Sequence, residues 1–267
     1  MRTEVRVVGE RMVVRHGGVR GEAPVAAVAA EIARLGHRQP SCPVLPAGTR
    51  VWLERGDAVG VCIELPPQAR VVRWLSASSR VPFGRTAKYE RYFISFPWIE
   101  ILLVFRRGAL TGYQQLYYRR ESLDAGEDLL LPNLFNVARG YGQKCWLCLV
   151  NLEDLTSLAW PAKIRAVVEH VFGAAFNRSS EVHEQNSLFG AMVKAKIDPR
   201  VDSIETWQEA TRADPRFALQ VPWRAANTTV SAELHRMLDG VVGPGTVTTA
   251  EDLAALVALL GEKGCAA

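Results

Sequence analysis

The segment from residue 90 to residue 120, ERYFISFPWIEILLVFRRGALTGYQQLYYRR, decides the expected fold. It is rich in β-branched and aromatic residues, which favour strands, and the sequence RRG supplies turn residues between its apolar runs. The same signal occurs earlier in TRVWLER, AVGVCIELPP and ARVVRWLS, between residues 49 and 76. Because turn residues separate most of these strands at short intervals, the sequence predicts an antiparallel meander.

Helical patterns flank the predicted strands. Residues 23–36 carry apolar side chains at helical spacing with Gly36 as a stop, and the alternation in EVRVVGERMVVRHGG before them predicts a hairpin around Gly9. After Pro161, the segment PAKIRAVVEHVFGAAFN has apolar residues along one helical face. Two more helices are predicted, at SIETWQEATRA and at TAEDLAALVALLGEKG near the end of the chain.

The order of these elements predicts an α+β fold, an antiparallel β-meander flanked by helices. We expect three regions along the chain. Residues 1–43 form an N-terminal extension of hairpin and helix, residues 44–190 form the α+β core, and residues 191–267 form a C-terminal helical region packed on that core.

Composition excludes several classes of protein. The chain has 267 residues, 48% of them hydrophobic, which is enough for a sizeable core, and its net charge of +4 comes from dispersed arginines without a run of like charges. Nucleic acid is therefore not an expected partner. The N-terminus lacks the apolar stretch of a signal peptide, and WIEILLVF is too short to cross a bilayer. We expect no membrane contact, a cytoplasmic location and reduced thiols, since the five cysteines are an odd number.

Cys145 and Cys148 stand three residues apart in QKCWLCL. A structural zinc site needs four ligands, and the chain has no second short-spaced pair, so no metal is expected. A redox pair should lie between a strand and a helix N-terminus, whereas CWLCLVNL resembles a strand. In a strand, Cys145 and Leu147 face one way while Trp146 and Cys148 face the other. At least one of the two cysteines is therefore expected in the core.

The segments LLLPNLFNVARGYGQKCWLCL and LAWPAKIRAVVEHVF resemble the active-site region of ubiquitin-conjugating enzymes. In that family a meander ends in His-Pro-Asn, passes through Asn-Val, a glycine and Cys-Leu, and reaches Trp-x-Pro ahead of a helix. The asparagine element is matched either by Pro132 and Asn133 or by Asn136 and Val137. The remaining elements are matched by Gly142 with Cys145 and by Trp160 with Pro161.

The chain is more similar to the prokaryotic divergent branch of that superfamily, typified by PRTRC system protein B. The motifs VLPAGTRVWLERGDAVGVCIELPPQARVVRWL, LFNVARGYGQKCWL and VFGAAFNRSSEVHEQN occur in the family's order and cover roughly residues 44–190. Each motif alone is weak, and their order carries the resemblance. It implies a UBC fold, the architecture of ubiquitin-conjugating enzymes.

The resemblance implies that a cysteine accepts a ubiquitin-like modifier as a thioester and transfers it to an amine. Gly-x-x-Cys favours Cys145 as this nucleophile, and the Cys-Leu that precedes the tryptophan favours Cys148; we prefer Cys145. Asn136 is the candidate donor to the oxyanion, with Asn133 as the alternate. Lys144 and Arg139 lie close enough in sequence to supply positive charge. No cofactor or metal is required.

The implied partners are a ubiquitin-like modifier protein, a ThiF-type activating enzyme and a JAB-type peptidase, encoded at a bacterial mobile-element or defence locus. Leu131 stands where the family has its histidine, which keeps a second interpretation open: a catalytically inactive binding or adaptor protein of the same fold. His183 and Asn186 are either polar groups of a binding pocket or residues that satisfy the backbone of their own loop.

Overall fold

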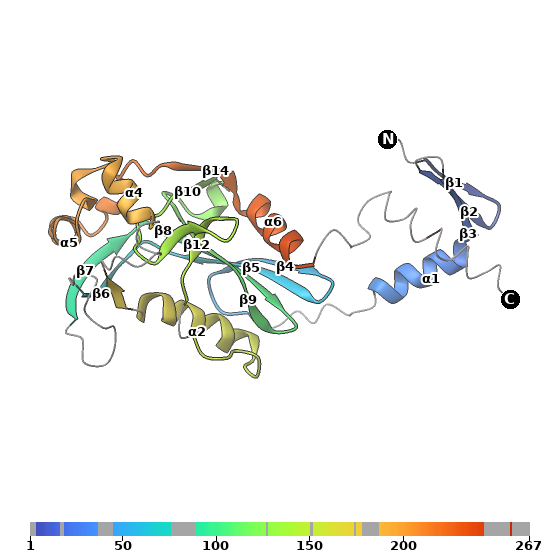
Figure 1. The fold of residues 1–267 in the computed structure, drawn as a ribbon, viewed down its shortest axis with the longest axis horizontal. Coiled ribbons are helices and arrows are strands. Elements are labelled where there is room, and N and C mark those ends of the chain that lie inside the picture. Colours follow the sequence, from blue (N-terminus) through green and yellow to red (C-terminus); the bar gives the residue numbers. More distant parts are fainter. Residues whose placement is uncertain are drawn as a thin grey trace. The chain divides into compact units, whose positions relative to one another are not determined.

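The computed structural model divides the chain into two compact units, residues 1–43 with 244–267, and residues 44–243 (Figure 1). It describes residues 4–16, 19–36, 45–75, 89–126, 128–149, 152–173, 175–177, 187–242 and 257. The fold is α+β, as the order of elements predicted.

The described part of the first unit contains a three-stranded antiparallel sheet and a helix that follows it, and it confirms the predicted hairpin and helix. Strands β1 (Glu4–Val8), β2 (Arg11–His16) and β3 (Val19–Pro24) pair in that order, and α1 (Val25–Gly36) follows directly. The small core contains Val14, Ala23, Val28 and Val257. The sequence analysis grouped residues 244–267 with the C-terminal helical region; here they belong with residues 1–43, because Val257 is buried among side chains of that unit.

The second unit is built on a large antiparallel sheet whose main path has the order β11-β12-β9-β8-β5-β4. Every strand predicted between residues 49 and 120 is present. The bounds of the strands on this path are β4 (Thr49–Arg55), β5 (Ala58–Leu65), β8 (Trp98–Arg106), β9 (Ala109–Arg119), β11 (Val137–Gly140) and β12 (Gln143–Leu147). The short strand β10 (Asp128–Leu130) pairs with β9 and with β14 (Ala225–Thr229).

The meander is interrupted by a second sheet. Strands β6 (Gln68–Leu75) and β7 (Glu90–Phe96) pair with each other, and β13 (Ala175–Asn177) adds to β6 in parallel. Strand β5 therefore pairs with β8 and not with the next strand in sequence. Prolines mark both departures, at residues 66–67 and at Pro97. Since proline has no backbone N–H, the hydrogen-bond ladder does not continue through these positions.

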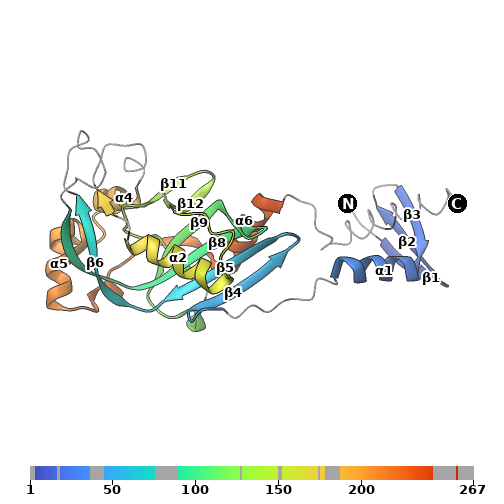
Figure 2. The ribbon, with the colours of Figure 1, turned by 90° about the horizontal axis from the view of Figure 1, so that it is seen from below.

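Two helices cover opposite faces of the large sheet (Figures 1 and 2). Helix α6 (Val230–Val242) lies over β5, where a Cβ built on Gly60 would come within 3.1 Å of Leu238. Helix α2 (Trp160–Gly173), which the sequence predicted, lies on the other face and sets Trp160 against Phe105 with a ring separation of 5.1 Å. Because both faces are covered, β8 is buried along most of its length.

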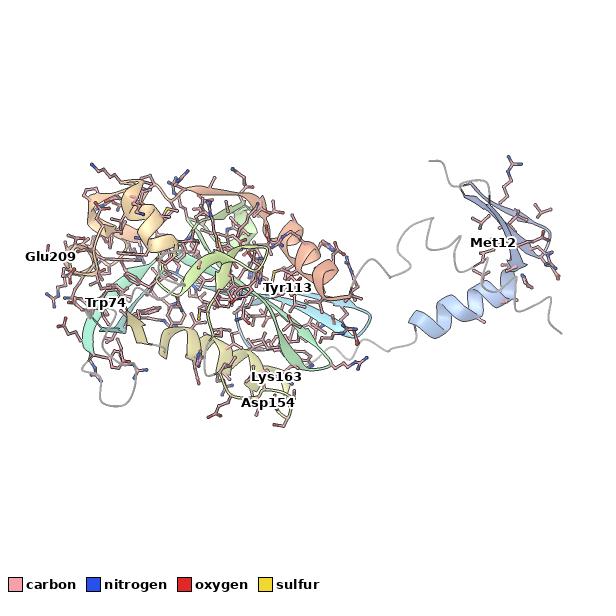
Figure 3. The ribbon with its side chains drawn as sticks, viewed as in Figure 1. Met12, Trp74, Tyr113, Asp154, Lys163 and Glu209 are labelled. Carbon is pink, nitrogen blue, oxygen red and sulfur yellow. The ribbon has the colours of Figure 1, made fainter. Side chains whose placement is uncertain are left out.

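A buried lysine fastens α2 to the sheet. The ammonium of Lys163 donates to the carbonyl oxygens of Gly108 at 2.6 Å and Thr156 at 2.9 Å. Figure 3 shows Lys163 and Asp154 at the same end of α2. Burial lowers the pKa of Lys163. The side chain therefore joins the β8–β9 turn to the segment before α2.

The C-terminal part of the second unit contains two more helices, α4 (Leu188–Lys194) and α5 (Ile204–Ala213). Helix α5 confirms the prediction for SIETWQEATRA and begins with a capping box between Ser203 and Thr206. Its Trp207 is fully buried and donates from the indole to the carbonyl of Ser95 in β7 at 2.9 Å. Of the helix predicted near the end of the chain, only Val257 lies within the described residues, and it is helical. Three short 3-10 turns complete the unit, at Leu123–Ala125, Pro199–Val201 and Phe217–Leu219.

Candidate functional site

The candidate site lies on the hairpin of β11 and β12. Its two-residue turn is formed by Tyr141 and Gly142, whose φ angles are +51° and +70°, between the paired residues Gly140 and Gln143. Two successive positive φ angles are the type I′ geometry that matches the twist of a hairpin, and glycine takes the second at no steric cost. This turn fixes the pairing beside it, and a register shift between Ala138 and Gly140 then moves the pairing by one residue, so that Ala138 faces Trp146.

Cys145 points into the core from β12. Its relative exposure is 0%, and its backbone N–H donates to the side-chain oxygen of Gln115 at 3.2 Å. Burial raises the pKa of the Cys145 thiol, although a hydrogen bond with Tyr117 and the charges of Arg139 and Lys144 oppose the rise. The two cations lower the pKa of Cys145, as the sequence predicted, but burial raises it by more. In this conformation Cys145 lacks the exposure and the thiolate character that a nucleophile needs.

Cys148 has the opposite environment. Leu147 is buried like Cys145, whereas Trp146 and Cys148 are partly exposed, so the predicted alternation along the strand is confirmed. The N–H of Cys148 donates to the carbonyl oxygen of Asn136 at 2.8 Å, one residue beyond the paired Val137 and Leu147. Residues directly opposite in an antiparallel pair project to the same face. The register therefore sets Cys148, and not Cys145, beside Asn136.

The side-chain amide of Asn136 is buried, and neither its nitrogen nor its oxygen has a hydrogen-bond partner in the described part of the chain. A buried amide without partners is costly, on the order of 1–3 kcal/mol. Unpaired groups of this kind in a native protein require an explanation, and one explanation is a ligand or reaction intermediate that completes the pairing.

Asn133, the alternate asparagine, is differently placed. It is fully buried, and its amide nitrogen donates to the carbonyl oxygen of Val201 at 2.8 Å. This bond ties the segment between β10 and β11 to the 3-10 turn Pro199–Val201. Because its donor is used within the core, Asn133 is a structural residue in this conformation.

The tryptophan and proline of the predicted motif hold α2 in position. Trp160 packs edge-on against Trp52, with ring centroids 4.8 Å apart, as well as against Phe105, and the Lys163 ammonium lies 5.5 Å from its ring. Pro161 is the second residue of the helix, where its missing N–H has no consequence. His183 and Asn186 lie outside the described residues.

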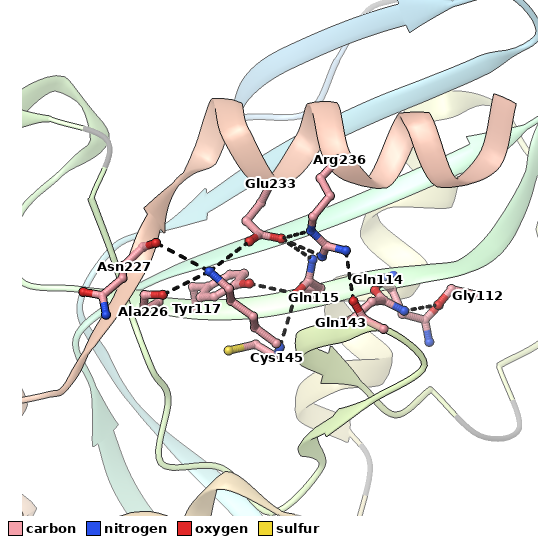
Figure 4. A network of polar contacts seen from close by, with 12 residues as sticks. Gly112, Gln114, Gln115, Tyr117, Gln143, Cys145, Ala226, Asn227, Glu233 and Arg236 are labelled. Carbon is pink, nitrogen blue, oxygen red and sulfur yellow. Dashed lines mark hydrogen bonds and ion pairs between the residues drawn. The ribbon is translucent and has the colours of Figure 1, made fainter. Parts of the chain in front are cut away.

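A buried polar network connects the hairpin to α6 (Figure 4). Glu233 is 2% exposed and accepts from the Gln115 amide at 3.0 Å and from two nitrogens of Arg236 at 3.0 and 2.7 Å. Burial raises the pKa of Glu233, but the hydrogen bonds from Arg236 and Gln115 prevail and leave that pKa below its ordinary value. The hydroxyl of Tyr117 donates to Gln115 at 2.7 Å, and Gln115 in turn binds the N–H of Cys145.

Sequence reasoning missed this network because it did not predict α6. The signal was present in VSAELHRMLDGVV, where apolar residues recur at helical spacing and Glu233 and Arg236 stand three apart, a spacing at which side chains of a helix meet. Arg236 also reaches across to the hairpin and donates to the carbonyl of Gly142 at 3.0 Å. Helix α6 therefore supports the turn of the hairpin on which the candidate site lies.

Within the described residues, no group of three or more His, Cys, Asp and Glu side chains is placed to hold a metal ion. None of the helices described is both long enough and apolar enough to cross a membrane. Comparisons with protein families, with curated proteins and with solved structures found no match to this chain.

Proposed function

We propose that the protein is a ubiquitin-conjugating-like protein in which Cys148, rather than Cys145, accepts a ubiquitin-like modifier as a thioester. The single observation that carries this proposal is the register of the hairpin, which pairs the partly exposed Cys148 with Asn136 and its unpartnered amide. The order of the sequence motifs supplies the family to which this chemistry belongs.

The reaction has two steps. The Cys148 thiolate attacks the thioester carbonyl of the modifier carried by the activating enzyme, a new C–S bond forms, and the activating enzyme's thiolate leaves. An amine of the target then attacks the Cys148 thioester, and the Cys148 thiolate leaves as the amide forms and the amine gives up a proton. In both steps a negative charge develops on the carbonyl oxygen, and the Asn136 amide is the donor proposed to stabilise it.

The partners of this proposal are a ubiquitin-like modifier protein, a ThiF-type activating enzyme and a JAB-type peptidase. They are identified by the resemblance of the sequence motifs alone. The proposal also includes a cytoplasmic location, where thiols stay reduced and available for thioester exchange.

A second candidate function is a non-catalytic binding or adaptor protein of the same fold. The observation that favours it is the complete burial of Cys145, the cysteine that the Gly-x-x-Cys spacing matches to the family's nucleophile. Leu131 in place of the histidine favours the same interpretation. This candidate predicts that no thioester forms on either cysteine.

The first test needs no partner protein. The native chain is treated with iodoacetamide at neutral pH, and the alkylated cysteines are located by peptide mass mapping over time. The proposal expects Cys148 to react at least about 10-fold faster than the buried Cys62 and Cys145, because alkylation requires an accessible thiolate. Equal rates at Cys145 and Cys148 would contradict the assignment.

The second test is intact mass under non-reducing conditions, after incubation with the activating enzyme, the modifier and ATP. The proposal expects a thiol-labile adduct in the wild type and in Cys145→Ala, none in Cys148→Ala, and a thiol-resistant ester in Cys148→Ser. Asn136→Ala should slow transfer to an amine more than it slows charging. No adduct in any sample, with the activating enzyme shown to be charged, would establish the adaptor.

A further inference from the structure

A pocket of about 520 Å³ opens between the β11–β12 hairpin and the start of β14. Three of its lining residues are cations, Arg139, Lys144 and Arg224, and its lining contains no carboxylate. The remaining lining residues are Leu131, Gly142, Gln143, Ala225, Ala226 and Asn227. Neither of the asparagines nor either of the cysteines proposed for thioester chemistry lines it.

Lys144 is held in place at the wall of this pocket. Its ammonium donates to the carbonyl oxygens of Ala226 at 3.3 Å and Asn227 at 3.5 Å, and it lies 3.7 Å from a carboxylate oxygen of Glu233. The side chain is still 47% exposed. One oxygen of the Glu233 carboxylate faces Lys144 and the other binds Arg236 and Gln115, so this single negative charge is shared between two cations and does not neutralise the pocket.

The side-chain N–H groups of the two arginines are available to a ligand. Arg139 and Arg224 are exposed, and neither side chain makes a hydrogen bond or ion pair with any residue that the structure describes. Each guanidinium carries five N–H groups in a planar fork that fits the oxygens of a phosphate or carboxylate. Three cations around one cavity repel each other, and an anion between them would turn that repulsion into attraction.

We propose that this pocket binds a small polyanion, a molecule with two or more phosphate or carboxylate groups. The arginine forks take the anionic groups in bidentate fashion, and Lys144 adds a positive charge at the pocket wall. The volume is within the range of small-molecule sites. The cations line one cavity instead of a long stripe, which favours a compact ligand over an extended acidic peptide. The site goes beyond the proposed thioester function and does not depend on Cys148.

The test is isothermal titration calorimetry on the full chain with two probes, pyrophosphate and citrate, at an ionic strength matched with sodium chloride. The variants are Arg139→Gln and Arg224→Gln, and the matched control is Arg165→Gln on the exposed face of α2. We expect the wild type and the control to bind one equivalent of at least one probe. Each pocket variant should bind about 10-fold more weakly or not at all, with an unchanged far-UV circular dichroism spectrum.

The two probes distinguish the source of the anion. Tighter binding of pyrophosphate assigns a phosphate-bearing ligand, and tighter binding of citrate assigns a polycarboxylate; both results support the pocket. The inference is overturned if neither probe binds, if both pocket variants bind as well as the control does, or if only a synthetic acidic peptide binds. A Cys148→Ala protein should bind the probes like the wild type, so a failure of the thioester proposal leaves this test intact.

Discussion

Replacing Glu233 with alanine should destabilise the second unit by about 3 kcal/mol. Gln115 is fully buried, so its amide would lose its acceptor without access to water, at a cost of about 1–3 kcal/mol. Arg236 would lose its two hydrogen bonds to Glu233, but its side chain is 39% exposed, so water can take the place of the carboxylate. We therefore assign about 1 kcal/mol to the loss of these two bonds. Glu233→Gln keeps one acceptor oxygen and should cost about half as much.

The assay is urea unfolding followed by tryptophan fluorescence. All seven tryptophans lie between Trp52 and Trp223, so the signal reports on the second unit alone. With a slope of about 2 kcal/mol per molar urea, a loss of 3 kcal/mol lowers the midpoint by about 1.5 M. Arg212→Ala, which changes an exposed side chain on α5, is the control and should shift the midpoint by less than about 0.3 M.

The pH dependence gives a second check on the same carboxylate. The folded state holds the pKa of Glu233 below its ordinary value of 4.5, so the ionised group stabilises the fold above pH 4.5. That contribution is lost as the pH falls through the lowered pKa. The wild type and Glu233→Gln should therefore differ less in free energy of unfolding below pH 4.5 than at pH 7. A loss under about 1 kcal/mol at pH 7 for Glu233→Ala would refute the reasoning that this network stabilises the fold.

Three further predictions concern the core. Gly48→Ala should cost more than about 2 kcal/mol, seen as a lower thermal midpoint, because φ is +92° and the new Cβ would lie 2.7 Å from the carbonyl oxygen of Glu64; Gly112→Ala, with open space around it, is the control. Burial raises the pKa of Glu100 to about 7, so the folded wild type retains a proton that the unfolded chain loses above pH 4.5. The free energy of unfolding of the wild type, measured in urea, should fall between pH 4.5 and 7, whereas that of Glu100→Gln should not change over this range. The same pH dependence in both proteins would contradict this. Trp207→Phe should cost about 1–3 kcal/mol in the same assay, because it leaves a buried carbonyl unpaired; no change in midpoint would refute that role.

Strands and helices with a strong local pattern were predictable from the sequence. The strands from Thr49 to Arg119 and the helices at residues 25–36, 160–173 and 204–213 follow from apolar periodicity and turn residues. Helix α6 was not predicted, although its periodicity was present. The separation of β6 and β7 into a second sheet was also missed, since pairing of β5 with β8 joins strands more than 30 residues apart in sequence.

The candidate site divides in the same way. The sequence alone determined that Cys145 and Cys148 face opposite sides of a strand, because side chains alternate along any extended chain. It also determined the residue types around them, including the asparagines and the glycine of the turn. These are local properties, which depend on a residue and its near neighbours.

Only the tertiary structure decided which cysteine meets which asparagine. That depends on the register of β11 against β12, which the turn at Tyr141 and Gly142 and the register shift between Ala138 and Gly140 set together, and a further shift of one residue would turn every side chain to the other face. Burial of Glu233 with Gln115, 118 residues away, and the meeting of Arg139 with Arg224 at one pocket likewise require the folded chain. No local pattern encodes such contacts, because they arise only when distant segments pack.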